Sequence, residues 1–228
     1  MNDLGACLPG LSDCRRCPRL VAHMAQLPPR RGLARSDYRN RPVPGFGDPQ
    51  ARICLVGLAP GAHGANRTGR PFTGDGAGDF MYPLLHQAGY GSRPLATSTD
   101  DGLRLQDLYI TNAVKCLPPE NLPRPEEFAA CRPFLGAELA ALPRLRVVVA
   151  LGQGAYTSCL RLFKEQGLVR RLADHPFGHG CEVPLPGGTV LVGCYHTSRY
   201  NVQTGRMTSA LFLDLLARVA RTAGGENG

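Results

Sequence analysis

The chain has 228 residues, of which 43% are hydrophobic, and its formal net charge is +8. This length and apolar content can fill the core of one ordinary domain, which excludes a disordered chain. The start of the sequence lacks a charged segment followed by an apolar run, and no stretch of about 18 apolar residues occurs. We therefore expect neither export nor a membrane span, and a cytoplasmic protein.

The positive charge comes almost entirely from arginine, because Lys115 and Lys164 are the only lysines. Guanidinium groups match phosphate oxygens well, so this charge favours a polyanionic partner such as DNA or RNA. An arginine-rich, lysine-poor chain with 20 prolines is also typical of a GC-rich genome or a thermophile. Charge alone leaves both explanations open.

Nine cysteines in a reducing compartment are poor disulfide candidates. Cys14 and Cys17 form a Cys-x-x-Cys pair, whose tight turn brings two thiolates to one ion or cluster. Cys116 and Cys131, fifteen positions apart, form a looser second pair. These four cysteines are the candidate ligands of a metal centre. The others are expected to be non-ligands: Cys7, Cys54, Cys159, Cys181 and Cys194.

The secondary-structure pattern begins with residues 1–50, whose prolines and arginines predict an irregular arm. Four apolar runs follow, each ending in small or polar residues as buried parallel strands do: 53–57, 108–114, 147–152 and 189–196. Helical spacing lies between and after them, at 78–88, 126–142, 154–163 and 207–223. This alternation predicts a single α/β domain over residues 1–228, a three-layer α/β/α fold with a central four-stranded parallel sheet.

Ligands of such sheets bind beyond the carboxyl ends of the strands. The loop over residues 57–76 is rich in glycine, but Arg70 and Pro71 stand where a nucleotide-binding loop needs Lys and Ser or Thr. The glycines after the third strand, Gly152 and Gly154, lack the third glycine of a dinucleotide motif. Nucleoside triphosphates and NAD are thus disfavoured.

Three side chains at the strand ends suit a nucleobase. Phe72 offers a flat face for a planar ring, and the Asn112 carboxamide can donate and accept hydrogen bonds together. His196 can donate to a developing negative charge. Each also has a purely structural explanation, as loop packing, a strand-end cap or a structural histidine. Their joint placement at strand ends favours a site.

The motifs at the strand ends, in this order, resemble those of the uracil-DNA glycosylase superfamily. They are Gly57-Leu58-Ala59-Pro60-Gly61, Gly69-Arg70-Pro71-Phe72-Thr73-Gly74, Thr111-Asn112-Ala113-Val114-Lys115-Cys116 and His196-Thr197-Ser198-Arg199. The four cysteines resemble those of the iron-sulfur branches, types 4 and 5, and the resemblance runs from Cys14 to about Arg206. The first motif resembles type 5, because Leu58 and Ala59 replace the carboxylates of the other branches.

The resemblance implies a monofunctional DNA N-glycosylase of base-excision repair, which flips out uracil and hydrolyses its glycosidic bond. His196 would stabilise the leaving base at O2, Asn112 would bind the opposite edge and Phe72 would stack. Ala59 and Gly61 would belong to the base pocket. Because Gly61 replaces the tyrosine that excludes thymine elsewhere in the family, we expect a broader range of deaminated bases, including hypoxanthine.

Catalysis of base departure needs little activation of water, so a carboxylate is not obligatory. Asp75 is the nearest carboxylate in sequence that could stabilise the sugar cation or hold water, and it could equally cap the helix that follows. The segment after His196 would enter the minor groove, as it does in related enzymes. Its members are Ser198, Arg199, Tyr200 and Asn201, with Tyr200 as the wedge and Arg199 as a phosphate or groove contact; an ordinary surface turn is the alternative.

The implied cofactor is a structural [4Fe-4S] cluster on Cys14, Cys17, Cys116 and Cys131, with structural zinc as the alternative because four thiolates suit both. The implied partner is double-stranded DNA, with single-stranded DNA as a further substrate, bound by a monomer associated with the nucleoid. Two other classes stay open: a non-catalytic cysteine-metal module that binds nucleic acid, and an electron-transfer protein.

Overall fold

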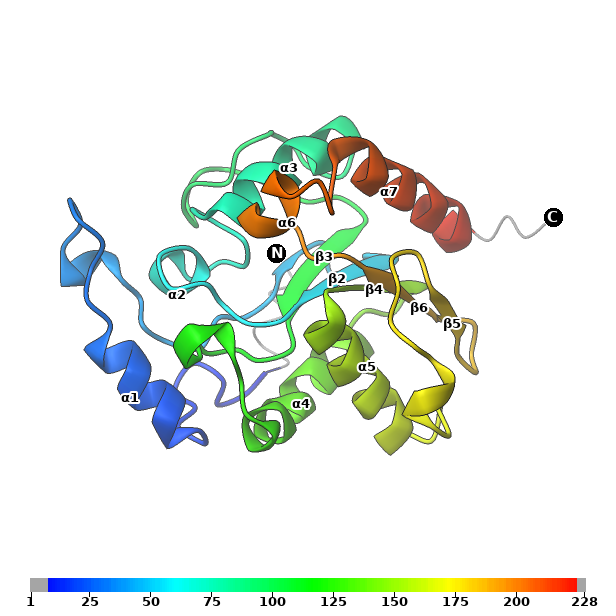
Figure 1. Ribbon diagram of the computed structural model, residues 1–228, viewed down its shortest axis with the longest axis horizontal. Helices are drawn as coiled ribbons and strands as arrows, with labels where there is room; N and C mark the ends of the chain where they lie inside the picture. Colours follow the sequence, from blue (N-terminus) through cyan, green and yellow to red (C-terminus); the bar gives the residue numbers. More distant parts are fainter. Residues whose placement is uncertain (1–7, 225–228) are drawn as a thin grey trace.

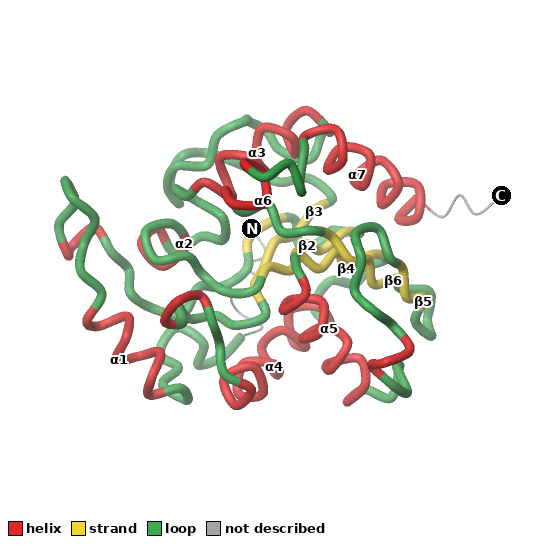
Figure 2. The backbone as a smooth tube through the Cα atoms, in the orientation of Figure 1, coloured by secondary structure: helices red, strands yellow, loops and turns green. Residues whose placement is uncertain are grey.

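The computed structural model describes residues 8–224 and places one mixed sheet between two layers of helices (Figures 1 and 2). The strand order is β1-β3-β2-β4-β6-β5. The four inner strands run parallel, as expected, and the two edge strands pair antiparallel to their neighbours. The strands are β1 (Phe46–Gly47), β2 (Ile53–Gly57), β3 (Leu108–Asn112), β4 (Val147–Leu151), β5 (Glu182–Pro184) and β6 (Val190–Cys194).

The two edge strands correct the prediction of a four-stranded sheet. β1 is two residues long and β5 three, with only the middle residue of β5 buried. Edge strands this short carry no apolar run, so nothing in their sequence separates them from loops. They protect the edges of the sheet without changing the parallel core.

The helices lie where helical spacing was expected, within a few residues at each end. α3 and α7 cover one face of the sheet and α4 and α5 the other (Figure 1). Alternate residues of β2 face the two layers, with Ile53 and Leu55 toward α3 and α7 and Cys54 and Val56 toward α4 and α5. The α-helices are α1 (Pro18–Gln26), α2 (Ala65–Thr68), α3 (Gly76–Gln87), α4 (Pro125–Ala140), α5 (Gln153–Glu165), α6 (Arg199–Gln203) and α7 (Ser209–Gly224), and the short 3₁₀ turns are η2 (Arg35–Asp37), η3 (Pro119–Asn121) and η4 (Leu172–Asp174).

The amino-terminal arm is less irregular than expected, because it contains α1. Pro18 occupies the first helical turn, where its missing N–H costs nothing, and Leu20 and Met24 lie one turn apart on the buried side. Arg19 pairs with Glu127 of α4 through two charge-assisted hydrogen bonds of 2.8 and 2.7 Å. The arm is therefore packed onto the domain through both apolar and ionic contacts.

The register of the sheet brings the loops after the strands together. Gly57 lies opposite Asn112 in the parallel pair of β2 and β3, and Leu151 lies opposite Cys194 in that of β4 and β6. The four carboxyl ends thus meet at one edge, as doubly wound sheets require. No helix within residues 8–224 is long and apolar enough to cross a bilayer.

Candidate active site at the carboxyl ends of the strands

A cavity of about 610 Å³ opens at the carboxyl ends of the parallel strands. Eight of the residues predicted from the sequence line it: Ala59, Gly61, Phe72, Asp75, Asn112, His196, Ser198 and Arg199. These residues come from four separate loops, so the fold has gathered them from across the chain. Tyr200 and Asn201 do not line the cavity.

Phe72 is buried and has a left-handed backbone, with φ of +52°. This conformation is strained for a residue with a side chain, and such strain is typical of functional sites. Its carbonyl oxygen lies against Gly78, where a Cβ would approach to 1.7 Å. The Phe72 ring faces the imidazole of His196, with centroids 6.0 Å apart and planes tilted by 35°. The ring therefore presents a fixed flat surface beside the histidine.

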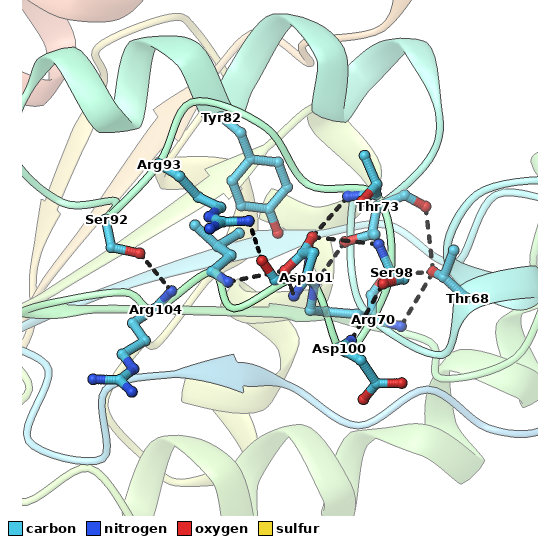
Figure 3. Close-up of polar contacts among 12 residues, drawn as sticks. Thr68, Arg70, Thr73, Tyr82, Ser92, Arg93, Ser98, Asp100, Asp101 and Arg104 are labelled. Atoms are coloured by element: carbon cyan, nitrogen blue, oxygen red, sulfur yellow. Dashed lines mark hydrogen bonds and ion pairs between the residues drawn. The ribbon is translucent and has the colours of Figure 1, made fainter.

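A buried polar network holds the loop that carries Phe72 (Figure 3). The Arg70 guanidinium pairs with both carboxylate oxygens of Asp101, at 2.9 and 2.5 Å, and donates to the Thr73 hydroxyl at 2.9 Å. The Tyr82 hydroxyl donates to the backbone oxygen of Pro71 at 2.9 Å. Burial alone would raise the pKa of Asp101, but hydrogen bonds from Arg70 and backbone N–H groups lower it. The network stays charged and stiffens the loop at neutral pH.

Asn112 is the last residue of β3 and is 2% exposed. Its Oδ1 lies over Gly57, where a Cβ would approach to 2.4 Å, so this position admits only glycine without rearrangement. Within residues 8–224 the carboxamide has no hydrogen-bond partner. Its donor and acceptor are therefore free for a ligand in the cavity.

His196 follows β6, and burial lowers the pKa of its imidazole to about 4. The ring is neutral at pH 7 and can donate a proton in a hydrogen bond without carrying charge. The Asn201 carboxamide donates to the backbone oxygen of His196 at 2.8 Å. The structure thus places Asn201 against the histidine backbone, whereas the sequence predicted it on the DNA surface.

Asp75 caps α3 with one carboxylate oxygen and leaves the other beside the cavity. Its Oδ1 accepts hydrogen bonds from Ala77 N at 3.1 Å and Gly78 N at 3.0 Å, so it caps α3. Its Oδ2 lies on the side of Gly61 and Gly64, where a Cβ on Gly61 would approach to 3.2 Å. Burial raises the pKa of the carboxyl, and the two N–H groups oppose that rise. One oxygen caps the helix while the other remains available beside the cavity.

The segment after His196 forms the short helix α6, where the sequence predicted a loop. The Ser198 hydroxyl caps this helix by accepting from Asn201 N at 3.4 Å. The Arg199 side chain lies against the start of α3, with Nε 3.1 Å from where a Cβ on Gly76 would stand. Tyr200 is 72% exposed on α6, more than Leu95 or Leu122, the other exposed large apolar side chains within residues 8–224. The exposed Tyr200 ring therefore follows directly after Arg199 on α6.

Sequence reasoning missed several residues of the cavity, chiefly Arg30, Leu58, His63 and Asn121. Asn121 and its neighbour Glu120 both have positive φ, near +57° and +55°, in a turn between prolines. Two consecutive left-handed residues other than glycine are rare and mark a functional turn. The only sequence signal at this turn was the density of prolines around it, and prolines do not indicate which way the side chains point.

A second, narrow cavity is lined by all four predicted metal ligands: Cys14, Cys17, Cys116 and Cys131. Burial and the neighbouring thiol of Cys131 raise the pKa of Cys17 to about 11. Burial and the same neighbour raise the pKa of Cys116 as well, so these thiols lie close enough to affect one another. Among residues 8–224, however, no three Cys, His, Asp or Glu side chains are arranged around a single ion.

Four of the five remaining cysteines lie within residues 8–224, and none of the four lines this cavity. Cys54 and Cys159 are buried between the sheet and α5, and Cys194 is buried on β6. Cys181 is partly buried and accepts a hydrogen bond from Gly178 N at 3.4 Å. Cys7 lies outside the described residues.

The doubly wound sheet and the cavity at its carboxyl edge are those of the uracil DNA glycosylase superfamily, to which the chain belongs: the family model matches residues 44–220. The type-5 uracil-DNA glycosylase of Thermus thermophilus is 54% identical over 215 residues, 94% of this chain and 95% of that protein. That of Pyrobaculum aerophilum is 42% identical over 214 residues, 94% and 91% of the two chains. The type-4 enzyme of Thermotoga maritima is 41% identical over 118 residues, only 51% of this chain. The likeness over nearly the full length is therefore to type 5, as the first motif predicted.

Proposed function

We propose that the protein excises uracil from DNA by hydrolysing the N-glycosidic bond, which leaves an abasic site for base-excision repair. The observation that carries this proposal is the meeting of Phe72, Asn112 and a neutral His196 around one cavity. The type-5 relatives are named as uracil-DNA glycosylases, which agrees with this chemistry. Flipping a base into such a cavity costs a few kcal/mol, and less for a mismatched pair.

Base recognition follows from the two buried side chains that have fixed positions. The Phe72 ring stacks on the flipped base, and the free carboxamide of Asn112 reads its polar edge with one donor and one acceptor. Ala59 and Gly61 contribute no bulk beyond a methyl group to the cavity wall. We therefore include hypoxanthine and other deaminated bases in the substrate range.

Departure of the base as an anion needs a donor at O2, and His196 supplies it. Because burial keeps the imidazole neutral, its N–H stabilises the negative charge that develops on the leaving base. A cationic imidazole would also bind the substrate before the bond breaks. A single preorganised donor of this kind contributes about 3 to 4 kcal/mol in related oxyanion sites. The Asn201 contact fixes the backbone that carries the ring.

The sugar cation and the attacking water lie on the opposite side of the scissile bond from the base. Asp75, whose Oδ2 is not used in the helix cap, and Asn121 line the same cavity. We assign Asp75 to stabilise the cation or hold the water, since neither Leu58 nor Ala59 has a polar side chain. Asp75 keeps its capping role throughout, so its position does not depend on substrate.

DNA would bind across α6. The Tyr200 ring, exposed at 72%, is our candidate wedge for the space left by the flipped base, and Arg199 is a phosphate or groove contact. Ser198 supports both by capping the helix. Double-stranded DNA is the expected substrate, single-stranded DNA a further one, and the protein would act as a monomer.

We also propose that the enzyme is monofunctional, releasing the base without cutting the strand. A glycosylase that cuts the strand forms a Schiff base with an amine. Lys115 is fully buried and paired with Glu138, and Lys164 does not line the cavity. Borohydride should therefore fail to trap a covalent complex with DNA. We also propose a cytoplasmic location on the nucleoid, because a DNA-repair enzyme acts on the chromosome.

The four cysteines fit a structural [4Fe-4S] cluster. All four line one small cavity between the arm, the end of β3 and α4, and four thiolates are the usual ligands of this cluster. Structural zinc is the alternative, because four thiolates suit it as well. When bound, the cluster would link the arm covalently to the domain. None of its ligands lines the candidate active site, so no step of base release passes through it.

The test is a base-release assay on duplexes that contain uracil, hypoxanthine, xanthine or thymine at one defined position. The proposal predicts release of free uracil, with alkali-labile strands as the second product. Retained DNA binding without release would instead identify a non-catalytic module. Reversible reduction of the cluster without release would identify an electron-transfer protein.

A further inference from the structure

The amino-terminal arm forms part of the wall of the candidate active site. Arg30 of the arm lines the cavity. Further along, Arg39 N donates to Arg67 O at 3.0 Å and Asn40 N donates to Asn66 O at 3.2 Å, which ties the arm to α2 (Figure 1). The arm therefore does more than carry two cysteines, because it also brings side chains to the mouth of the cavity.

A chain of hydrogen bonds runs from the arm to His63 in the loop after β2. Arg30 N donates to the Tyr38 hydroxyl oxygen at 3.0 Å, and that oxygen lies 2.7 Å from Nδ1 of His63. Tyr38 is buried, and no other acceptor for its O–H is present within residues 8–224. An unpartnered buried hydroxyl is costly, so the O–H donates to Nδ1. The His63 ring therefore carries its own proton on Nε2.

The second nitrogen of His63 is available to a ligand. The ring lines the cavity, and the His63 backbone oxygen is fixed by Arg67 Nε at 2.8 Å. Nε2 has no partner among the residues that the structure describes. Arg30 lines the same cavity, and a neutral N–H donor together with a guanidinium suits an anion such as a phosphate.

We propose that His63 Nε2–H and the Arg30 guanidinium form a phosphate subsite, which holds a phosphodiester of the DNA strand beside the flipped nucleotide. The Arg199 side chain lies against Gly76 at the start of α3, at the far end of the chain segment that begins with His63 and α2. The strand is thus held on the α2 side by the arm and on the α3 side by α6. Tyr38 is a positioning residue, because it acts only by fixing the His63 tautomer. The subsite rests on the proposed function, since it serves a flipped nucleotide.

The charged half of the subsite is tested by salt dependence. Binding of a duplex with one tetrahydrofuran abasic site is measured by fluorescence anisotropy at pH 8 over a series of salt concentrations. Loss of one charged phosphate contact in Arg30→Gln should reduce the slope of log Kd against log salt by about 0.9. Arg31→Gln is the matched control, since Arg31 is exposed next to Arg30 but does not line the cavity, and its slope should stay at the wild-type value.

The neutral half is tested by affinity at fixed salt. His63→Ala should weaken binding about tenfold through loss of one hydrogen bond to a charged oxygen, with an unchanged salt slope. His63→Gln retains an N–H donor near Nε2 and should recover most of that loss. Tyr38→Phe should weaken binding in the wild-type background and add nothing to His63→Ala, because the two act as one unit.

Equal slopes for Arg30→Gln and Arg31→Gln, or wild-type affinity in His63→Ala, would overturn the subsite. Additive losses in the Tyr38→Phe, His63→Ala double variant would show that Tyr38 has only a structural role, and would overturn the tautomer argument. These outcomes are separate from failure of the proposed function, which would appear as no uracil release by the wild-type protein.

Discussion

The rings of Phe72 and His196 lie 6.0 Å apart, although one belongs to the loop before α3 and the other follows β6. Gly57, at the end of β2, makes room for this arrangement, since a Cβ there would stand 2.6 Å from the Phe72 ring. The stacking surface thus depends on a bare backbone beneath it. This dependence leads to the first prediction.

Gly57→Ala should reduce uracil release at least tenfold while leaving the protein folded. The added methyl group would meet both the Phe72 ring and Oδ1 of Asn112, at 2.6 and 2.4 Å, so both must shift. A misplacement of this size is enough to disrupt catalytic geometry. Gly91→Ala is the matched control, because its Cβ would make an ordinary contact of 3.4 Å with Arg93 O. Equal activity of the two variants in single-turnover assays would contradict the packing described.

Asp75 should separate into two measurable roles. Asp75→Asn keeps a side-chain oxygen for the α3 cap, so the melting temperature should stay close to wild type. Asp75→Ala loses the cap, at about 1 kcal/mol of unfolding free energy. If Oδ2 stabilises the sugar cation, both variants should lose activity to a similar extent, although only one loses stability. Full activity in Asp75→Asn would restrict the residue to capping.

The pH dependence should reveal the buried histidine. Burial lowers the pKa of His196 to about 4, so the folded protein resists a proton that the unfolded chain binds below its ordinary pKa of about 6.5. Stability from this group is complete above pH 6.5 and is lost as the pH falls toward 4. The unfolding free energy of wild type should therefore fall more steeply in that window than that of His196→Gln, as denaturant titrations can measure. Uracil release should show no step near pH 6.5.

The metal centre predicts a chemical composition. Purified protein should contain about four irons and four acid-labile sulfides per chain, with a broad visible absorption that Cys17→Ser abolishes. Loss of the cluster should lower the melting temperature, because Cys14 and Cys17 then no longer bind the arm to α4. If the purified protein instead contained one equivalent of zinc and no iron, the four cysteines would form a structural zinc site and not a cluster. Cys159→Ser, at a buried cysteine outside the group, is the control for metal content.

The sequence predicted the parallel strands because each is an apolar run that breaks into glycine or polar residues. The same logic directed attention to Asn112 and His196, which lie at or just past the ends of those runs, and to Phe72 in the loop region after the first run; all three line the cavity. It missed β1 and β5 because they are too short to carry a pattern. In the arm it gave too much weight to the prolines and overlooked Pro18 as the start of α1, where Leu20 is the first buried residue of that helix.

The cavity residues that the sequence did not predict were missed for a different reason. His63 and Asn121 lie in loops, and their direction depends on contacts far away in the sequence. Tyr38 of the arm orients His63, and Asn121 takes a left-handed backbone that no single-sequence pattern specifies. Asn201 was predicted to contact DNA because it follows the histidine, and nothing in the sequence indicated the hydrogen bond that its carboxamide donates to the His196 backbone.

The most direct test of the account is single-turnover release of uracil from a defined duplex by wild type and His196→Ala, with DNA affinity measured in parallel. Loss of one preorganised donor predicts a rate about 10²- to 10³-fold lower in the variant, at an affinity within about twofold of wild type. Release by the variant at close to the wild-type rate would contradict the central role of His196 as the donor to the leaving base.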